Sequence, residues 1–413
     1  MQAFDLVSQN ISQIIPIPIY VGVFVVLLFQ VFPRIFVAGR RSIAQSTAGR
    51  ADEESDIPSS IYDRDQSPSS LVTPDPTFSW RDNPQQIPRE IKPGKYFLTM
   101  NVRKLDFNDY IIFDKQFLSE YRERQAIISN VGPAKIFVAE ANDAALDLCE
   151  ETVMVTVDFL VTRYPSMFRR TERGVLCVDA GEEYDLVTRP WVRHPLEIMC
   201  LLSGDDYILM RCCDDGVLRV AAVGLVYSLD IDWTSFIGKD LTSIHKDARI
   251  PFYESAIQKS VDRYFLKLHP ERPVSRANWL TQVGPELRNE KFPDEYLRHV
   301  STIPGNTITP ETIVDDLYFR VERQAMRKLP SMHGVVFKFH LYATNIWDLE
   351  LEEGVPRRFA EHIRGLPESV LRQKHCLECV DGILKVMDLM AERQEKKTTN
   401  SHDQERDVPI SKI

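Results

Sequence analysis

The chain has 413 residues and a net charge of -10, with 44% hydrophobic and 27% charged residues. This composition is ordinary for a folded protein, and the acidic balance without a dense Lys/Arg run in the folded part argues against nucleic-acid binding. The seven cysteines are odd in number, and several lie in apolar segments, which argues against a disulfide framework and favours a reducing compartment.

The first apolar segment lies near the N-terminus. Twenty residues from Ile14 to Pro33 carry no charge, which is the length a helix needs to cross a bilayer. Arg34, Arg40 and Arg41 follow this run and no Lys or Arg precedes it, so the positive-inside rule places the C-terminal bulk in the cytosol. The sequence predicts a membrane anchor over residues 1–41, with a transmembrane helix at about 14–37. A cleaved signal peptide fits less well, because it needs a basic segment before its apolar core.

Residues 42–95 are rich in Ser, Pro and charged residues and show no hydrophobic period. Such a composition buries too little apolar area to offset the loss of chain entropy on folding. It predicts a disordered linker, in which Phe78 and Trp80 are unremarkable aromatics. Disorder is also predicted for the polar tail, residues 394–413.

Between them, residues 96–393 form the predicted domain. Asn142 is a plausible N-cap for a helix that Pro165 ends, and Asp215-Gly216 between two β-rich runs indicates a hairpin. In the last strand Val335, Phe337, Phe339 and Leu341 alternate with polar residues. These patterns predict an α+β fold with an antiparallel sheet and flanking helices. In chain order, the predicted elements are a helix at 142–164, strands at 207–213 and 217–226, a helix at 251–268, strands at 273–283 and 334–343, and helices over the last 60 or so residues.

His245 is the first candidate for chemistry, because it follows the apolar residues Leu241 and Ile244 just before a predicted helix. A neutral imidazole in an apolar pocket is a suitable axial ligand for haem iron. A lone histidine beside apolar residues is also typical of a core position, and local sequence leaves both interpretations open.

Two further groups are candidates for binding an anion. Arg320, Glu322 and Arg323 lie in an apolar frame, which indicates either a buried ion-pair network or a clamp for a carboxylate. Arg276 and Asn278 share one face of a predicted strand, which either lines a pocket or faces solvent.

His375-Cys376-Leu-Glu-Cys379 is a lone C-x-x-C motif. Its histidine precedes the first cysteine, whereas c-type haem attachment needs it after the second, and no second ligand pair for zinc is present. The two cysteines are therefore interpreted as incidental, and no role is assigned to His333. No Gly-rich nucleotide fingerprint follows a strand.

The order of several short motifs resembles the haem-dependent oxidative N-demethylase alpha-subunit family over roughly residues 97–390. The motifs are Leu105–Asp114, Tyr121–Arg124, Arg163-Tyr-Pro165, Trp233 with Gly238–Leu241 and Ile244-His245, Arg276-Ala-Asn278-Trp279, Arg320-Val-Glu322-Arg323-Gln324 and Leu329-Pro330-Ser331.

This resemblance implies a PAS-like sheet that holds haem b, with His245 as the axial ligand of the iron and Arg276, Asn278 and Arg323 in cofactor binding. It also implies oxidation of an amine N-methyl group or a related small metabolite by O2, with electrons from a separate reductase. Lys246–Pro251 stands where the family often has a Pro-Val-Pro turn, which puts the substrate in doubt.

The sequence thus predicts a membrane-anchored haem monooxygenase, with no catalytic residue assigned. By analogy with haem oxygenases tethered beside their reductase, we expect a single-pass protein of the endoplasmic reticulum with a cytosolic C-terminal domain. A non-catalytic PAS-like haem-binding sensor or pseudoenzyme is the alternative.

Overall fold

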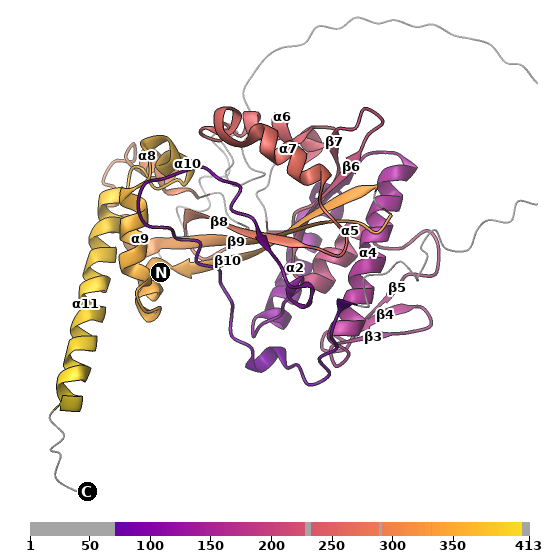
Figure 1. Cartoon of the computed structure of the whole chain (residues 1–413), viewed down its shortest axis with the longest axis horizontal. Helices are drawn as coiled ribbons and strands as arrows, with labels where there is room; N and C mark the ends of the chain where they lie inside the picture. Colours follow the sequence, from indigo (N-terminus) through magenta and orange to yellow (C-terminus); the bar gives the residue numbers. More distant parts are fainter. Residues whose placement is uncertain (1–70, 228–232, 289–290, 332, 407–413) are drawn as a thin grey trace, which may run out of the picture.

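The computed structural model describes residues 71–406 apart from 228–232, 289–290 and 332. Its centre is a seven-stranded antiparallel sheet in the order β1-β8-β9-β10-β6-β7-β2 (Figure 1). Strands β8, β9 and β10 are long and pair along most of their length, and Asn278 of β8 lies opposite Glu322 of β9. The strands are β1 (Arg103–Lys104), β2 (Phe137–Ala139), β6 (Asp206–Cys212), β7 (Leu218–Gly224), β8 (Val274–Val283), β9 (Leu317–Lys328) and β10 (Gly334–Asn345).

Helices cover both faces of this sheet. One face packs against α2 (Phe117–Val131), α4 (Asp143–Arg163) and α5 (Pro195–Ser203) and forms the largest apolar core. The opposite face forms a second core with α6 (Leu241–Asp247), the π-helix η6 (Tyr253–Ile257) and α7 (Gln258–Leu266). Because neighbouring residues of a strand point to opposite faces, each long strand serves both cores.

A third core closes one end of the sheet. It brings together aromatic residues of β8 and β9 with the helices that lie at the left of Figure 1. These helices are α8 (Pro293–Val300), α9 (Val355–Arg364), α10 (Glu368–Gln373) and α11 (Val380–Arg406). A separate three-stranded sheet, which was not predicted, consists of β3 (Phe168–Arg170), β4 (Gly174–Cys177) and β5 (Glu182–Asp185). The short elements are η3 (Trp80–Asp82), η4 (Phe107–Asp109), α3 (Pro133–Ile136), η5 (Trp233–Phe236), η7 (Thr312–Asp316) and η8 (Ile346–Leu351).

Most predicted elements of the domain are confirmed. The Asn142 side chain caps α4 by accepting a hydrogen bond from the backbone N–H of Ala145 at 2.9 Å. Strands β6 and β7 form the predicted hairpin, and β8 and β10 occupy the predicted strand segments. The α+β class with an antiparallel sheet is therefore confirmed.

Two helical boundaries differ from the prediction. The segment after Pro251 begins as a π-helix at Tyr253, because Phe252 has a φ of 64° and interrupts the α-helical path. The predicted disordered tail also begins too early, since α11 continues to Arg406. Apolar residues such as Met387 and Met390 anchor this helix on the third core.

The prediction of a disordered linker up to residue 95 is wrong for residues 71–95. The Trp80 side chain is 9% exposed, and its ring lies 5.7 Å from that of Phe117. The ring of Phe78 lies 4.7 Å from that of Tyr164. A few aromatic anchors supply the burial that the overall composition of the segment did not indicate.

The fold class is also corrected with respect to the membrane. Within residues 71–406, with the gaps given above, no helix combines the length and apolar composition that crossing a bilayer requires. The predicted transmembrane span at about residues 14–37 lies outside the described residues. For the described residues, the structure shows an α+β domain built on a large antiparallel sheet.

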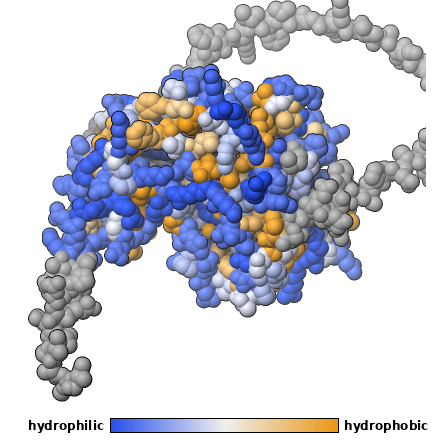
Figure 2. All heavy atoms as spheres, in the orientation of Figure 1, coloured by the Kyte–Doolittle hydropathy of each residue, from blue (hydrophilic) through white to orange (hydrophobic). Residues whose placement is uncertain are grey.

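The surface seen in Figure 2 is largely hydrophilic, and its apolar residues form several patches separated by hydrophilic ones. This distribution is ordinary for a folded protein surface.

Candidate functional site

A cavity of about 360 Å³ lies beside strand β8, and we call it the β8 cavity. Four parts of the chain line it: β8, the segment around α6 and η6, the helices α9 and α10, and a segment without regular structure at residues 90–101, here called the strap. The volume falls in the range typical of small-molecule sites. The cavity includes His245, Arg276 and Asn278, three of the four predicted site residues.

His245 lies in the last turn of α6 and is 3% exposed. Its Nδ1 is 2.6 Å from the carbonyl oxygen of Leu241. Since a carbonyl oxygen only accepts hydrogen bonds, Nδ1 carries the proton and the lone pair of the neutral ring is on Nε2. Burial, assisted by the nearby Arg276 charge, lowers the pKa of His245 to about 4, so the ring is neutral at pH 7.

The turn after α6 holds the imidazole ring in place. The ring of Tyr253 stacks on that of His245 with the centroids 4.2 Å apart and an angle of 6° between the planes. Arg249 and Phe252 both have positive φ, at 47° and 64°. Two left-handed residues other than glycine within one turn are a local backbone strain of the kind that concentrates at functional sites.

The charged side chains of the cavity are mainly cationic. Lys92, Lys95, Arg276 and Lys374 line it, and Glu90 is the carboxylate among the lining residues that the structure describes. Glu90 itself accepts hydrogen bonds from Arg103 at 2.6 Å and from Asn101 at 3.0 Å. Burial lowers the pKa of Arg276, which Glu322 and Tyr96 partly oppose. In a chain of net charge -10, this local excess of positive charge favours an anionic ligand.

Asn278 connects the cavity to a buried carboxylate. Its Oδ1 accepts a hydrogen bond from Lys374 Nζ at 2.7 Å, and its Nδ2 lies 3.5 Å from Glu322 Oε2. Glu322 also accepts a hydrogen bond from Gln324 at 2.7 Å. Burial raises the pKa of Glu322 to about 7, although Arg320 and the hydrogen bonds lower it. The predicted charged cluster on β9 is thus partly a buried network, which was one of the two interpretations of the sequence; the other was a clamp for a carboxylate.

Arg323, the fourth predicted site residue, does not lie at the cavity. It occupies the face of β9 that also carries Arg327, and its guanidinium donates to the carbonyl oxygen of Asp109. Arg320, on the same face as Glu322, donates to Gln282 at 2.9 Å and to two backbone carbonyl groups. The motif that contains both arginines therefore divides between the two faces of the sheet, because it forms a strand.

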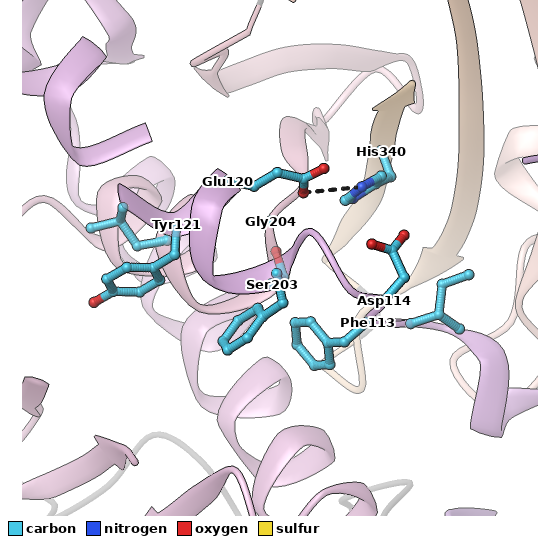
Figure 3. A pocket seen from close by; sticks show the side chains of 10 residues that line it. Phe113, Asp114, Glu120, Tyr121, Ser203, Gly204 and His340 are labelled. Atoms are coloured by element: carbon cyan, nitrogen blue, oxygen red, sulfur yellow. Dashed lines mark ion pairs between the residues drawn. The ribbon is translucent and has the colours of Figure 1, made fainter. Parts of the chain in front are cut away.

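A second, much smaller hollow lies on the α2 face of the sheet (Figure 3). Its volume of about 10 Å³ accommodates no more than a water molecule. Figure 3 shows Glu120 and His340 facing each other, with Nε2 of the histidine 3.4 Å from Oε2 of Glu120. Asp114 lies beside them, and Asp205 is 3.3 Å from the other ring nitrogen. This hollow is too small for a substrate.

The remaining motifs add no metal centre. All seven cysteines are free, and Cys376 and Cys379 are buried. No group of three or more His, Cys, Asp or Glu residues is placed to hold a metal ion in the part of the chain that the structure describes. His333 is exposed at the turn before β10.

Sequence reasoning missed the strap and Lys374. The first half of the strap, residues 90–95, lay within the predicted linker, and only its contacts reveal its place: the carbonyl oxygen of Lys92 is 2.7 Å from Nδ1 of His362 on α9. A Cβ atom at Gly365 would lie 2.0 Å from the carbonyl oxygen of Gly94, so glycine permits this close approach. The C-x-x-C motif at His375–Cys379 drew attention to this part of the chain. The residue that lines the cavity there, however, is the preceding Lys374.

The family comparison agrees with the resemblance seen in the sequence. Residues 101–384 match the family model described as "Haem-dependent oxidative N-demethylase, alpha subunit-like". The match covers most of the chain and includes strand β8, helix α6, helices α9 and α10 and the end of the strap. The chain belongs to the haem-dependent oxidative N-demethylase, alpha subunit-like family.

Proposed function

We propose that the chain binds haem b in the β8 cavity with His245 as the axial ligand, and that it oxidises an amine N-methyl group or a related small metabolite with O2. The single observation that carries this proposal is the state of His245. The imidazole is neutral, its Nδ1–H is engaged by the Leu241 carbonyl oxygen, and the ring lines the cavity. Metal-bound histidines commonly donate their second N–H to a backbone carbonyl in this way.

The other residues of the cavity fit the same group. Haem presents an apolar macrocycle and two carboxylates. Leu98, Ile250 and Ile257 provide apolar contacts, and Arg276, Lys92 and Lys95 provide partners for carboxylates. We assign Arg276 to a propionate because its guanidinium fork matches carboxylate geometry. Asn278 lines the same wall, where its amide is bonded to Lys374.

Each of these residues then has a definite task. His245 holds the iron, and Tyr253 and the Leu241 carbonyl oxygen keep the imidazole ring from rotating. Arg276 and the strap lysines orient the carboxylates and offset their charge. When bound, haem supplies the capacity to activate O2, and the protein provides orientation, polarity and access.

We propose that the electrons come from a separate reductase, because the sequence shows no Gly-rich nucleotide fingerprint. The acidic net charge of the chain favours a basic docking face on that partner.

A haem titration of the full chain tests the proposal. We expect a Soret band that saturates at one haem per chain and is lost or strongly weakened in His245→Ala. His333→Ala is the matched control, since that histidine is exposed and outside the cavity. A chain that stays colourless, or that binds haem equally well in His245→Ala, would contradict the assignment.

Turnover then separates an enzyme from a sensor. With haem bound, a reductase and candidate N-methyl amines, we expect oxygen-dependent loss of amine and release of formaldehyde. Haem binding without consumption of any amine would favour a non-catalytic haem-binding role.

A further inference from the structure

Lys374 is held in a defined position in the wall of the β8 cavity. Its Nζ donates to Asn278 Oδ1 at 2.7 Å and lies 5.2 Å from the centre of the Trp279 ring. A surface lysine normally samples many rotamers, and fixing one carries an entropic cost. Here an acceptor and an aromatic face keep the ammonium group at the cavity.

The backbone at Lys374 is fixed as well. Its carbonyl oxygen accepts hydrogen bonds from both the N–H and the hydroxyl of Thr281, each at 3.1 Å. The same hydroxyl lies 3.0 Å from the carbonyl oxygen of His375, which has a φ of 58°. A left-handed histidine is a strained conformation that persists only when its surroundings hold it. Strand β8 therefore holds the turn that directs Lys374 into the cavity.

A chain of polar groups continues behind Lys374 into the sheet. Both polar atoms of the Asn278 amide are engaged, by Lys374 on one side and Glu322 on the other. Gln324 donates to the same Glu322 oxygen at 2.7 Å. The ammonium group of Lys374, the amide of Asn278 and the carboxylate of Glu322 thus form a chain from the cavity into the sheet. In this chain the amide orients the lysine.

We propose that Lys374 is the proton-donating group of the β8 cavity, and that Asn278 and Glu322 position it. The inference rests on the proposed function, because the molecule that receives the proton is one bound in this cavity. In the step, an Nζ–H bond breaks, its electron pair stays on nitrogen, and the proton passes to a basic atom of the bound molecule. The neutral amine regains a proton from water that enters the cavity, and no electron is transferred.

The electrostatic surroundings suit this role. Burial and the Arg276 charge lower the pKa of Lys374 to about 8, while Glu322 and the Cys376 thiol oppose that shift. His362 faces it from α9, with a pKa that burial and Lys374 lower. Lys92, Lys95 and Glu90 of the strap and His245 of α6 line the same cavity. A donor that titrates close to neutral pH is the most effective general acid.

Competitive labelling of the full chain without added haem tests the titration directly. The chain is acetylated with trace acetic anhydride over a range of pH, and the peptide with Lys374 is quantified by mass spectrometry. We expect a labelling midpoint near pH 8, well below the ordinary lysine value of 10.5. In Glu322→Gln the midpoint moves to lower pH, because a negative charge that favours the ammonium form is removed. A Lys374 midpoint at the ordinary lysine value of 10.5 would overturn the proposal.

Two substitutions test the proton transfer. Arginine keeps the positive charge but does not release a proton near neutral pH. We expect Lys374→Arg and Lys374→Met to keep the Soret band and to lose turnover by about a hundredfold, the scale of a missing general acid. Lys115→Arg is the control and keeps full turnover.

The other outcomes are equally decisive. Full turnover in Lys374→Arg would show that the residue only supplies charge, and loss of the Soret band in both variants would make it a haem-binding residue. Either result overturns the inference. If the unmodified chain takes up no haem, the proposed function fails, and the labelling midpoint still decides whether Lys374 titrates near neutral pH.

Discussion

The two faces of the large sheet bury charged side chains in opposite ways. On the α2 face, Arg124 pairs with Asp206 at 2.7 Å and Lys338 with Asp205 at 2.6 Å, and the adjoining hollow measures about 10 Å³. On the other side, cations outnumber carboxylates around a cavity of about 360 Å³. Closely paired charges with no space between them compensate each other within the fold, whereas an excess of one sign around an open space indicates a ligand of the opposite sign.

The largest expected effect is on the paired face. Arg124 and Asp206 are both fully buried, so Arg124→Leu leaves an uncompensated carboxylate in the core. We expect the free energy of unfolding, measured with urea, to fall by about 3–5 kcal/mol. The exposed pair of Arg81 and Asp179 is the control, since Arg81→Leu changes stability by less than about 1 kcal/mol. Equal changes in the free energy of unfolding for the two substitutions would show that burial of the Arg124–Asp206 pair does not matter for stability.

On the same face, His340 gives a stability that depends on pH. Burial alone would lower its pKa, but Glu120 and Asp205 outweigh burial and raise it to about 9. Because the pKa of His340 is higher in the folded state, the protonated ring stabilises the folded state. This contribution is fully present below pH 6.5, the unfolded pKa, and is lost as pH rises through 9. We expect a loss on the order of 3 kcal/mol between these limits, and a much flatter profile in His340→Gln. The same slope in both proteins would refute the assignment.

Glu322, on the cavity side, also makes the stability fall as pH rises, but over a lower pH range. Its pKa is raised from 4.5 to about 7, mainly by burial, so its contribution falls as pH rises from about 5 through 7. The predicted decrease is roughly 2–3 kcal/mol, and it disappears in Glu322→Gln. Urea unfolding of both proteins from pH 5 to pH 9 measures it. A decrease confined to pH 7–9 would assign the titration to His340 instead.

The smallest effects separate the two arginines that the sequence grouped together. The proposed function assigns Arg276 to a haem carboxylate, so Arg276→Ala is expected to lower haem affinity about tenfold. Arg323→Ala changes it by less than about twofold, because its guanidinium lies on the other face and bonds to Asp109. Haem titrations of the two variants side by side measure the difference. A larger loss in the Arg323 variant would contradict the proposed position of the haem carboxylates beside Arg276.

Much of the fold was predictable from local patterns. Asn142 marked the start of α4, and the alternation from Val335 to Leu341 predicted one apolar side of β10, which the structure packs into the second core. Strand β9 was not predicted from the sequence, because Arg320, Glu322 and Arg327 interrupt its apolar period, although all three are buried. Their burial depends on partners elsewhere in the chain, which composition and spacing do not reveal.

The site was predictable only in part. His245, Arg276 and Asn278 were identified from the sequence, and the fold brings them to one cavity. Lys374 was not, because its position depends on the contacts of Thr281 and on the strained His375. The strap was missed because its segment resembles a linker in composition, while a few contacts such as that of Lys92 with His362 hold it.

The central claim is that the His245 imidazole binds haem iron, and chemical rescue tests it most directly. In His245→Gly, the missing ring leaves space that free imidazole can occupy. We predict that this variant loses the absorption spectrum of the haem-loaded protein, and that added imidazole restores it in a saturable manner. An unchanged spectrum in His245→Gly without imidazole would contradict the account.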